Sequence, residues 1–201
     1  MISNQSLQKR NIKMLGAIIG DIAGSRFEFN NIHTKEFELF AGNCFFTDDS
    51  VMSLAIAKAI IESKGNYVHL GDTAAKYMQS IGQNYPNCGY GGSFYSWIFS
   101  PNPKPYNSYG NGAAMRVSAC GWAAKTLEEA IILSEKVTEI SHNHKEGLLG
   151  AEAAAVAILM ARQGKSIPEI RKYIDENYYA LDFTLDEIRD NYYFNETCQK
   201  T

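Results

Sequence analysis

Residues 45–52 read Phe-Phe-Thr-Asp-Asp-Ser-Val-Met, which places a hydroxyl and two adjacent carboxylates just before an apolar run with a helical pattern, residues 51–61. Oxygen donors of this kind suit a hard divalent cation such as Mg²⁺, which prefers carboxylates and hydroxyls to sulfur or nitrogen. Threonine, aspartate and serine are also the preferred N-cap residues, and the helix macrodipole favours acidic groups in a first turn. Taken alone, the stretch is better explained as a helix cap than as a metal site.

The composition around this stretch is that of a soluble globular protein. The chain has 201 residues, of which 45% are hydrophobic and 20% charged, so one substantial domain is the default expectation. Its net charge of −3 leaves no excess of positive charge to meet a phosphate backbone. We therefore expect no nucleic-acid partner and no membrane association.

The cysteines and the N-terminal segment predict where the protein works. Residues 1–13 are polar and lack the apolar region of a secretion signal, so we interpret them as a flexible N-terminal extension before a single domain over residues 14–201. The cysteines form no paired C-x-x-C unit, and we expect reduced thiols in a cytoplasmic protein. The four are Cys44, Cys88, Cys120 and Cys198.

Helical periodicity runs through most of the chain, and no segment shows convincing strand alternation. The interval 85–109 differs, because its prolines, glycines and aromatic residues exclude a long helix. Such a loop can stack on a flat ligand or simply pack on the core. The pattern predicts an all-α fold with helices near residues 14–24, 49–62, 70–81, 93–99, 113–124, 127–140, 146–162 and 167–178, and a further helix start at 184.

Two carboxylates near the N-terminus need an explanation. Residues 14–24 carry glycines at four-residue spacing, which predicts a central helix that other backbones approach closely. Asp21 lies within this apolar run, and a carboxylate there needs a partner or a task. Glu28 follows the run, and on sequence alone the favoured interpretation is a surface ion pair with Arg26.

Two later motifs are also ambiguous. The sequence Gly110-Asn111-Gly112 precedes a helical pattern, so it suits either a plain turn or an anion site at a helix N-terminus. His142 and His144 form a His-x-His pair without a third zinc ligand in suitable local spacing. We expect one of these rings to bond a backbone group or a ligand hydroxyl instead.

Taken together and in order, these motifs resemble the ADP-ribosylglycohydrolase family, which includes the dinitrogenase reductase-activating glycohydrolases. The resemblance rests on residues 20–28, 47–50 and 110–116, followed by Ser141-His142 and the alanine-rich residues 146–162, and it extends from about residue 14 to 199. It implies a compact orthogonal bundle of helices. It also implies a hydrolase, a glycosidase that releases ADP-ribose from a modified protein or a related small conjugate by means of two Mg²⁺ or Mn²⁺ ions.

The resemblance also implies roles for individual residues. Thr47, Asp48 and Asp49 match the first group of metal ligands, and the two aspartates with Glu28 form the implied catalytic set. Glu28 matches an acidic residue near the scissile bond. The implied substrate-binding residues are the loop that cradles the diphosphate, its flank and a histidine beside the nucleotide: Gly110, Asn111, Gly112, Ala113, Ala114, Met115 and His142.

One departure from the family pattern limits these expectations. The family completes its metal site with a later G-G-D-x-D-T segment, and the 201 residues contain none. We therefore expect a C-terminally incomplete copy, at most a partial metal site, and exposed apolar helix faces that promote self-association. The alternative is a catalytically inactive module that binds ADP-ribose or a nucleotide, or that serves only as an interaction surface.

Overall fold

The computed structural model describes residues 15–193 and 197–201, and the predicted flexible extension over residues 1–13 lies outside this part of the chain. The described residues are helical and contain no strand beyond one isolated bridge, between Gly110 and Thr197. The predicted all-α class is therefore confirmed. None of the helices in these ranges combines the length and apolar character needed to cross a membrane. All four cysteines are free thiols.

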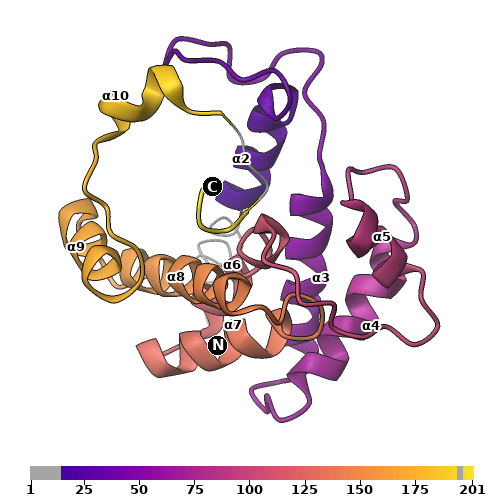
Figure 1. Ribbon diagram of the computed structural model, residues 1–201. Helices are drawn as coiled ribbons and strands as arrows, with labels where there is room; N and C mark the ends of the chain where they lie inside the picture. The colour runs from indigo at the N-terminus through magenta and orange to yellow at the C-terminus, as the bar shows by residue number, and fades with distance from the viewer. Residues whose placement is uncertain (1–14, 194–196) are drawn as a thin grey trace, which may run out of the picture.

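The helices follow the predicted order with small shifts at their ends (Figure 1). The main difference is that the helix predicted over residues 113–124 is split into a short 3₁₀ turn and a later α-helix. The α-helices are α2 Leu15–Gly24, α3 Asp48–Glu62, α4 Leu70–Gly82, α5 Gly92–Ile98, α6 Ser118–Ala123, α7 Leu127–Thr138, α8 Lys145–Arg162, α9 Ile167–Asn177 and α10 Leu185–Ile188. The 3₁₀ helices are η1 Ser25–Phe27, η2 Asn111–Ala113 and η3 Arg189–Asn191.

Side-chain caps fix several helix starts. Thr47 caps α3, because its side chain accepts a hydrogen bond from the backbone N–H of Asp49. The predicted capping box at α10 is confirmed, since Thr184 and Glu187 satisfy each other's backbone N–H groups. The residues that begin these helices are therefore set by local hydrogen bonding, which is why the sequence predicted them well.

The core forms where α3, α4, α6, α7 and α8 meet (Figure 1). Two of these helices approach closely, because a Cβ at Gly121 of α6 would lie 2.5 Å from the carbonyl oxygen of Ala155 in α8. Only glycine tolerates that distance. The largest apolar side chains that are completely buried in this core are Met52, Ile56, Leu70, Met78, Ile98, Leu133 and Leu159.

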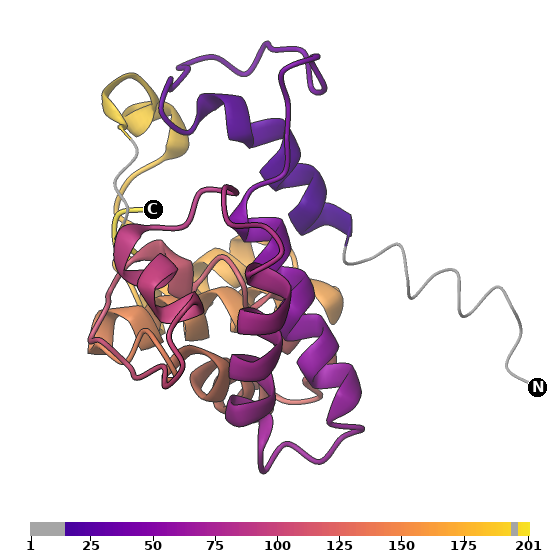
Figure 2. The same cartoon turned by 90° about the vertical axis from the view of Figure 1, so that its right-hand side faces the viewer.

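The prediction that α2 is a tightly packed central helix is wrong for the described residues. No atom lies within 4 Å of a Cβ built on Gly16, Gly20 or Gly24. Leu15 and Ile19 remain 45% and 43% exposed. Figure 2 shows α2 at the edge of the molecule, extending from the N-terminal end of α3. The glycines permit a close neighbour, but no second helix of the described chain occupies that space.

Candidate functional site

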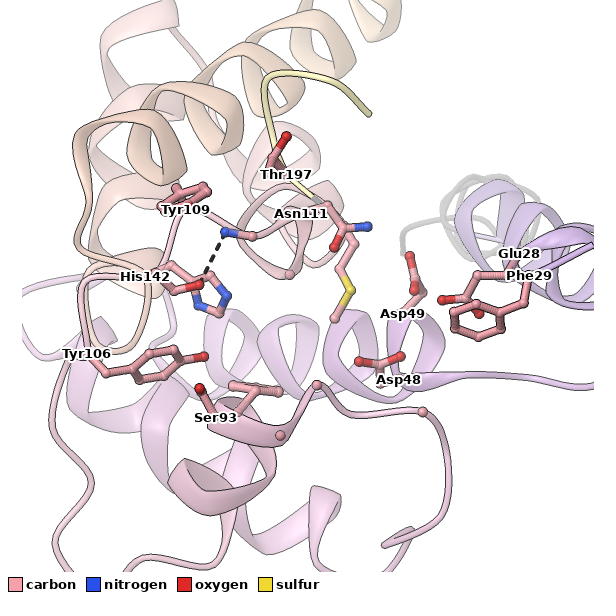
Figure 3. A pocket seen from close by; sticks show the side chains of 18 residues that line it. Glu28, Phe29, Asp48, Asp49, Ser93, Tyr106, Tyr109, Asn111, His142 and Thr197 are labelled. Carbon is pink, nitrogen blue, oxygen red and sulfur yellow. Dashed lines mark hydrogen bonds between the residues drawn. The ribbon is translucent and has the colours of Figure 1, made fainter. Parts of the chain in front are cut away.

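A cavity of about 760 Å³ opens between segments that lie far apart in the sequence (Figure 3). Its size is in the range of small-molecule and cofactor sites. Three carboxylates, Glu28, Asp48 and Asp49, line one side, and His142 lies on the other. The structure therefore brings together residues that the sequence separated by more than a hundred positions. The other lining residues are Phe29, Gly89, Gly91, Gly92, Ser93, Phe94, Tyr106, Ser108, Tyr109, Gly110, Asn111, Gly112, Met115 and Thr197.

Asp21 holds the turn that carries the two adjacent aspartates. Its carboxylate accepts hydrogen bonds from the backbone N–H and hydroxyl of Thr47, at 2.9 and 2.6 Å. It also accepts from the backbone N–H of Ser50, at 3.2 Å, and from the Ser50 hydroxyl. From its sequence position Asp21 was expected to need a partner, but it was not among the predicted site residues. The sequence signal for its importance was a carboxylate within an apolar helix. The four donors that it binds, from Thr47 and Ser50, are visible only in the folded structure.

A glycine allows a second segment to approach the same turn. The backbone N–H of Asp48 donates to the carbonyl of Cys88, at 2.9 Å. Gly89 adopts a positive φ of +109°, and a Cβ there would lie 3.3 Å from Asp48 Oδ1. Glycine therefore suits the backbone conformation, which other residues rarely adopt, and leaves room beside the carboxylate.

Burial and mutual repulsion disfavour ionisation of the clustered carboxylates. Burial, with the nearby carboxylates of Asp49, Glu28 and Asp21, raises the pKa of Asp48 to about 7. Burial and the charge of Asp21 also raise the pKa of Asp49. A bound cation would favour the ionised forms of both groups.

The fit to a metal ion is partial. Asp48 and Asp49 line the cavity with hard oxygen atoms, whereas Thr47, the third expected ligand, is buried outside the lining with its hydroxyl bonded to Asp21. Within residues 15–193 and 197–201 no three His, Cys, Asp or Glu side chains form a group that could hold a metal. Mg²⁺ requires close to six oxygen ligands, some of which can be water. The described residues therefore supply only part of a ligand set.

Arg26 does not have the role that the sequence suggested. Its guanidinium, expected to pair with Glu28, donates instead to the carbonyl of Glu38 and lies 4.4 Å from the centre of the Phe27 ring. Glu28 lines the cavity together with Asp48 and Asp49. The interpretation of Glu28 as the ion-pair partner of Arg26 is therefore wrong.

The Gly110 loop, residues 110–115, differs in detail from the expected anion-binding site. The N–H groups of Ala113, Ala114 and Met115 donate to the carbonyls of Gly110 and Asn111, at 2.9 to 3.1 Å, and so satisfy the turn itself. The donors left for an anion at the start of η2 are the N–H groups of Asn111 and Gly112. A diphosphate in this loop would be held by fewer backbone groups than the sequence suggested.

Thr197 and Cys198, near the end of the described chain, contact this loop through backbone and thiol hydrogen bonds. Thr197 forms the isolated bridge with Gly110, and the backbone N–H of Cys198 donates to the carbonyl of Tyr109, at 3.0 Å. The Cys198 thiol lies 3.1 Å from the carbonyl oxygen of Gly110. Contacts over so long a sequence separation leave no local signal, which is why Thr197 was missed as a lining residue.

The two histidines have different roles in the structure. His144 caps α8, since its ring accepts a hydrogen bond from the backbone N–H of Glu146, and the expected bond from one ring to a backbone group is confirmed. His142 is buried, and its ring meets those of Phe94 and Tyr106 edge-on, with centroids 5.8 and 5.5 Å away. Burial and the nearby charge of Arg116 lower the pKa of His142 to about 2, so the ring is neutral at physiological pH.

Aromatic side chains form much of the remaining wall. Tyr106 and Tyr109 come from the proline- and glycine-rich interval, and Phe29 lies beside the carboxylates (Figure 3). The sequence of this interval indicated that it could stack on a flat ligand, but none of its rings was predicted as a site residue. The unusual density of aromatic residues was the signal that could have identified them.

Comparison with known proteins gives one consistent result. A family model described as ADP-ribosylglycohydrolase matches residues 5–199. The chain is 30% identical over 182 residues to ADP-ribosylhydrolase ARH3 of Xenopus tropicalis, an alignment that covers 78% of this chain and 51% of that relative. Human ARH3 is 25% identical over 195 residues, with 82% of this chain and 53% of the relative covered. The chain spans about half the length of the curated relatives it matches.

Proposed function

Because this chain belongs to the ADP-ribosylglycohydrolase family, we propose that its cavity binds the ADP-ribose part of a modified protein or of a related small conjugate, and that the site serves to hydrolyse the glycosidic bond of that group. The observation that carries the proposal is the pairing of chemistries across one cavity. Three carboxylates lie on one side, and the Gly110 loop with His142 lies on the other. ADP-ribose fits this arrangement, because its nucleotide and diphosphate can lie at the Gly110 loop and His142 while its other ribose lies at the carboxylates.

The proposed orientation assigns each end of the ligand to one wall. The diphosphate lies at the backbone N–H groups of Asn111 and Gly112, which can donate hydrogen bonds to its oxygens. The nucleotide end lies beside His142 and the ring of Tyr106. The other ribose then lies next to Asp48 and Asp49, and the aromatic rings pack against the flat parts of the ligand.

The acidic wall, which is the side of the cavity formed by Glu28, Asp48 and Asp49, carries the proposed chemistry. Glu28 orients or polarises the attacking water near the anomeric carbon, where an oxocarbenium-like charge develops as the bond breaks. Asp21 keeps the turn of residues 47–50 in place through its four hydrogen bonds. Thr47, Asp48 and Asp49 would hold a divalent cation, and such an ion, when bound, supplies Lewis-acid stabilisation of the ribose oxygens.

Release of free ADP-ribose tests the activity. The substrates are protein ADP-ribosylated on arginine, protein ADP-ribosylated on serine, and O-acetyl-ADP-ribose, each with Mg²⁺ and with excess EDTA. We expect turnover only with the metal, and a loss of at least about a hundredfold in Glu28→Gln. Asp72→Asn is the control, since Asp72 is an exposed carboxylate in the first turn of α4. Full activity in EDTA would contradict the metal role, and full activity of Glu28→Gln would contradict the role of Glu28.

A second candidate function is an ADP-ribose-binding or interaction module without catalytic activity. The specific observation in its favour is that the described residues supply only part of a metal ligand set. On this second function the chain hydrolyses none of the three substrates. Saturable binding of ADP-ribose without turnover would favour the binding module, whereas metal-dependent turnover would exclude it.

A further inference from the structure

Arg116 is a buried arginine that no carboxylate of the described residues neutralises. Its side chain is completely buried in the core behind the cavity. One terminal nitrogen, Nη2, donates to the carbonyls of Val137 and Thr138, at 3.1 and 3.4 Å, and to Ser141 Oγ, at 2.8 Å. Its guanidinium carbon lies 5.5 Å from the centre of the Phe94 ring. Carbonyl dipoles and an aromatic face therefore offset part of the charge, while Nε and Nη1 have no hydrogen-bond partner among the described residues.

The hydrogen bond to Ser141 continues to the cavity. Ser141 Oγ lies 2.9 Å from His142 Nδ1. An arginine can only donate, so Ser141 Oγ accepts from Arg116. The described residues offer the Ser141 hydroxyl no third hydrogen-bond partner, and the side chain is completely buried. Its own hydrogen therefore has one place to go, which is the lone pair of Nδ1.

We propose that Arg116 is a positioning residue that acts through Ser141 to hold His142 as the neutral tautomer with its proton on Nε2. If Nδ1 accepts a hydrogen bond, the proton of a neutral imidazole must be on the other nitrogen. The reverse arrangement would make Ser141 accept twice and leave its buried hydroxyl hydrogen unsatisfied, which is costly. The positive charge of Arg116 adds to this by opposing a second proton on the ring.

The tautomer determines what His142 offers to a ligand. A Cβ built on Gly112 would lie 3.0 Å from Nε2 and 3.4 Å from Cε1, so the ring edge with Nε2 faces the loop that lines the cavity. His142 therefore presents an N–H donor there and recognises an acceptor oxygen, such as that of a phosphate or a ribose. The use of this donor by ADP-ribose rests on the proposed function, whereas the tautomer itself rests only on the hydrogen-bond chain.

A long-range ¹H–¹⁵N spectrum of the chain labelled with ¹⁵N-histidine reads the tautomer directly. The chain has four histidines, and His142→Gln identifies the signals of His142 by their disappearance. At about pH 7 we expect the Nε2–H pattern for His142 in the wild type. An Nδ1–H pattern or a charged ring at that pH would overturn the proposal.

Substitutions test the relay, by which we mean the two hydrogen bonds that link Arg116 to Ser141 and Ser141 to His142. Ser141→Ala removes the link but keeps the charge of Arg116, and we expect it to populate the Nδ1–H form and to weaken ADP-ribose binding by about tenfold. Arg116→Lys keeps a donor and a positive charge, and we expect it to retain the Nε2–H form, whereas Arg116→Met loses it. Arg162→Met is the matched control, because Arg162 donates to the carbonyls of Trp122 and Ala124 away from His142.

The outcomes separate the relay from the proposed function. An unchanged Nε2–H pattern in Ser141→Ala would overturn the relay even if Arg116→Met failed to fold. An Nε2–H pattern in a wild type that does not bind ADP-ribose would support the relay and contradict the proposed function. The same pattern together with a tenfold loss of affinity in Ser141→Ala would support both.

Discussion

Asp21 is the residue on which the geometry of the acidic wall depends. One carboxylate satisfies the backbone and the hydroxyl of both Thr47 and Ser50. These donors come from a turn 26 to 29 positions later in the chain. An asparagine in this place has one acceptor oxygen, and its amide group would face donors.

Asp21→Asn is therefore expected to lower the free energy of unfolding by about 1–3 kcal/mol, since buried donors lose their acceptor. Urea unfolding measures the change. Asp72→Asn, at an exposed position, is expected to change it by less than about 0.5 kcal/mol. Equal effects of the two substitutions would show that Asp21 does not hold the turn.

His142 predicts a pH dependence of stability. Its pKa is about 2 in the folded protein, against a usual value of 6.5. Below 6.5 the unfolded chain gains a proton that the folded protein does not, so stability is lost as the pH falls through that value. The slope of this term approaches about 1.4 kcal/mol per pH unit. Urea unfolding at several pH values, compared with His142→Gln, isolates it. A wild type and variant with parallel pH profiles would contradict the buried neutral ring.

At the scale of helices, we expect the same substitution, glycine to alanine, to have opposite effects on stability at two helical positions. Gly121→Ala forces a Cβ to 2.5 Å from the backbone of α8 and should cost about 1–3 kcal/mol. Gly20→Ala meets no atom within 4 Å, and alanine favours the helix, so it should stabilise by up to about 1 kcal/mol. Thermal unfolding of both variants measures this. A destabilised Gly20→Ala would mean that α2 has a close neighbour after all.

The same contrast explains which elements the sequence could predict. Helices α9 and α10 begin at local capping boxes, and their starts were visible in a few adjacent residues. The packing of α2 was not visible, because a spacing of glycines indicates that a neighbour can approach but not that one does. The break between η2 and α6 was missed because the small residues of that segment suit a helix throughout.

At the scale of the whole molecule, α2 and α3 expose apolar side chains to solvent outside the cavity. Leu54 and Ile61 of α3 are 50% and 75% exposed, and Leu15 and Ile19 of α2 are also open. This agrees with the sequence-based expectation of exposed apolar faces. Exposed patches of this kind promote association.

We therefore predict concentration-dependent self-association that Ile61→Glu reduces, measured by sedimentation velocity. The substitution should change the free energy of unfolding by less than about 0.5 kcal/mol, because the side chain is largely in solvent. Lys172→Glu, on the exposed side of α9, is the control. A wild type that stays monomeric at all concentrations would contradict the prediction.

The site was predictable in its acidic residues and less so in its surroundings. The residues that the family pattern identified and that line the cavity are Glu28, Asp48, Asp49, Gly110, Asn111, Gly112, Met115 and His142. Thr47, Ala113 and Ala114 are not among the lining residues, and the roles of the whole set stay predictions. Asp21, Thr197 and the aromatic wall were not identified as site residues. Their positions depend on contacts between distant segments, such as the bridge from Thr197 to Gly110, which no local pattern encodes.

The central claim, that this cavity binds ADP-ribose, is tested most directly by calorimetric titration of ADP-ribose into the chain in the presence of Mg²⁺. We predict one saturable site in the wild type, unchanged affinity in the control Gly16→Ala, and affinity lowered by at least about tenfold in Gly112→Val. The reason is that a Cβ at Gly112 would lie 3.0 Å from His142 Nε2, and valine adds two methyl groups to it, whereas a Cβ at Gly16 has no atom within 4 Å. An absence of saturable binding, or equal affinity in a folded Gly112→Val variant, would contradict the account.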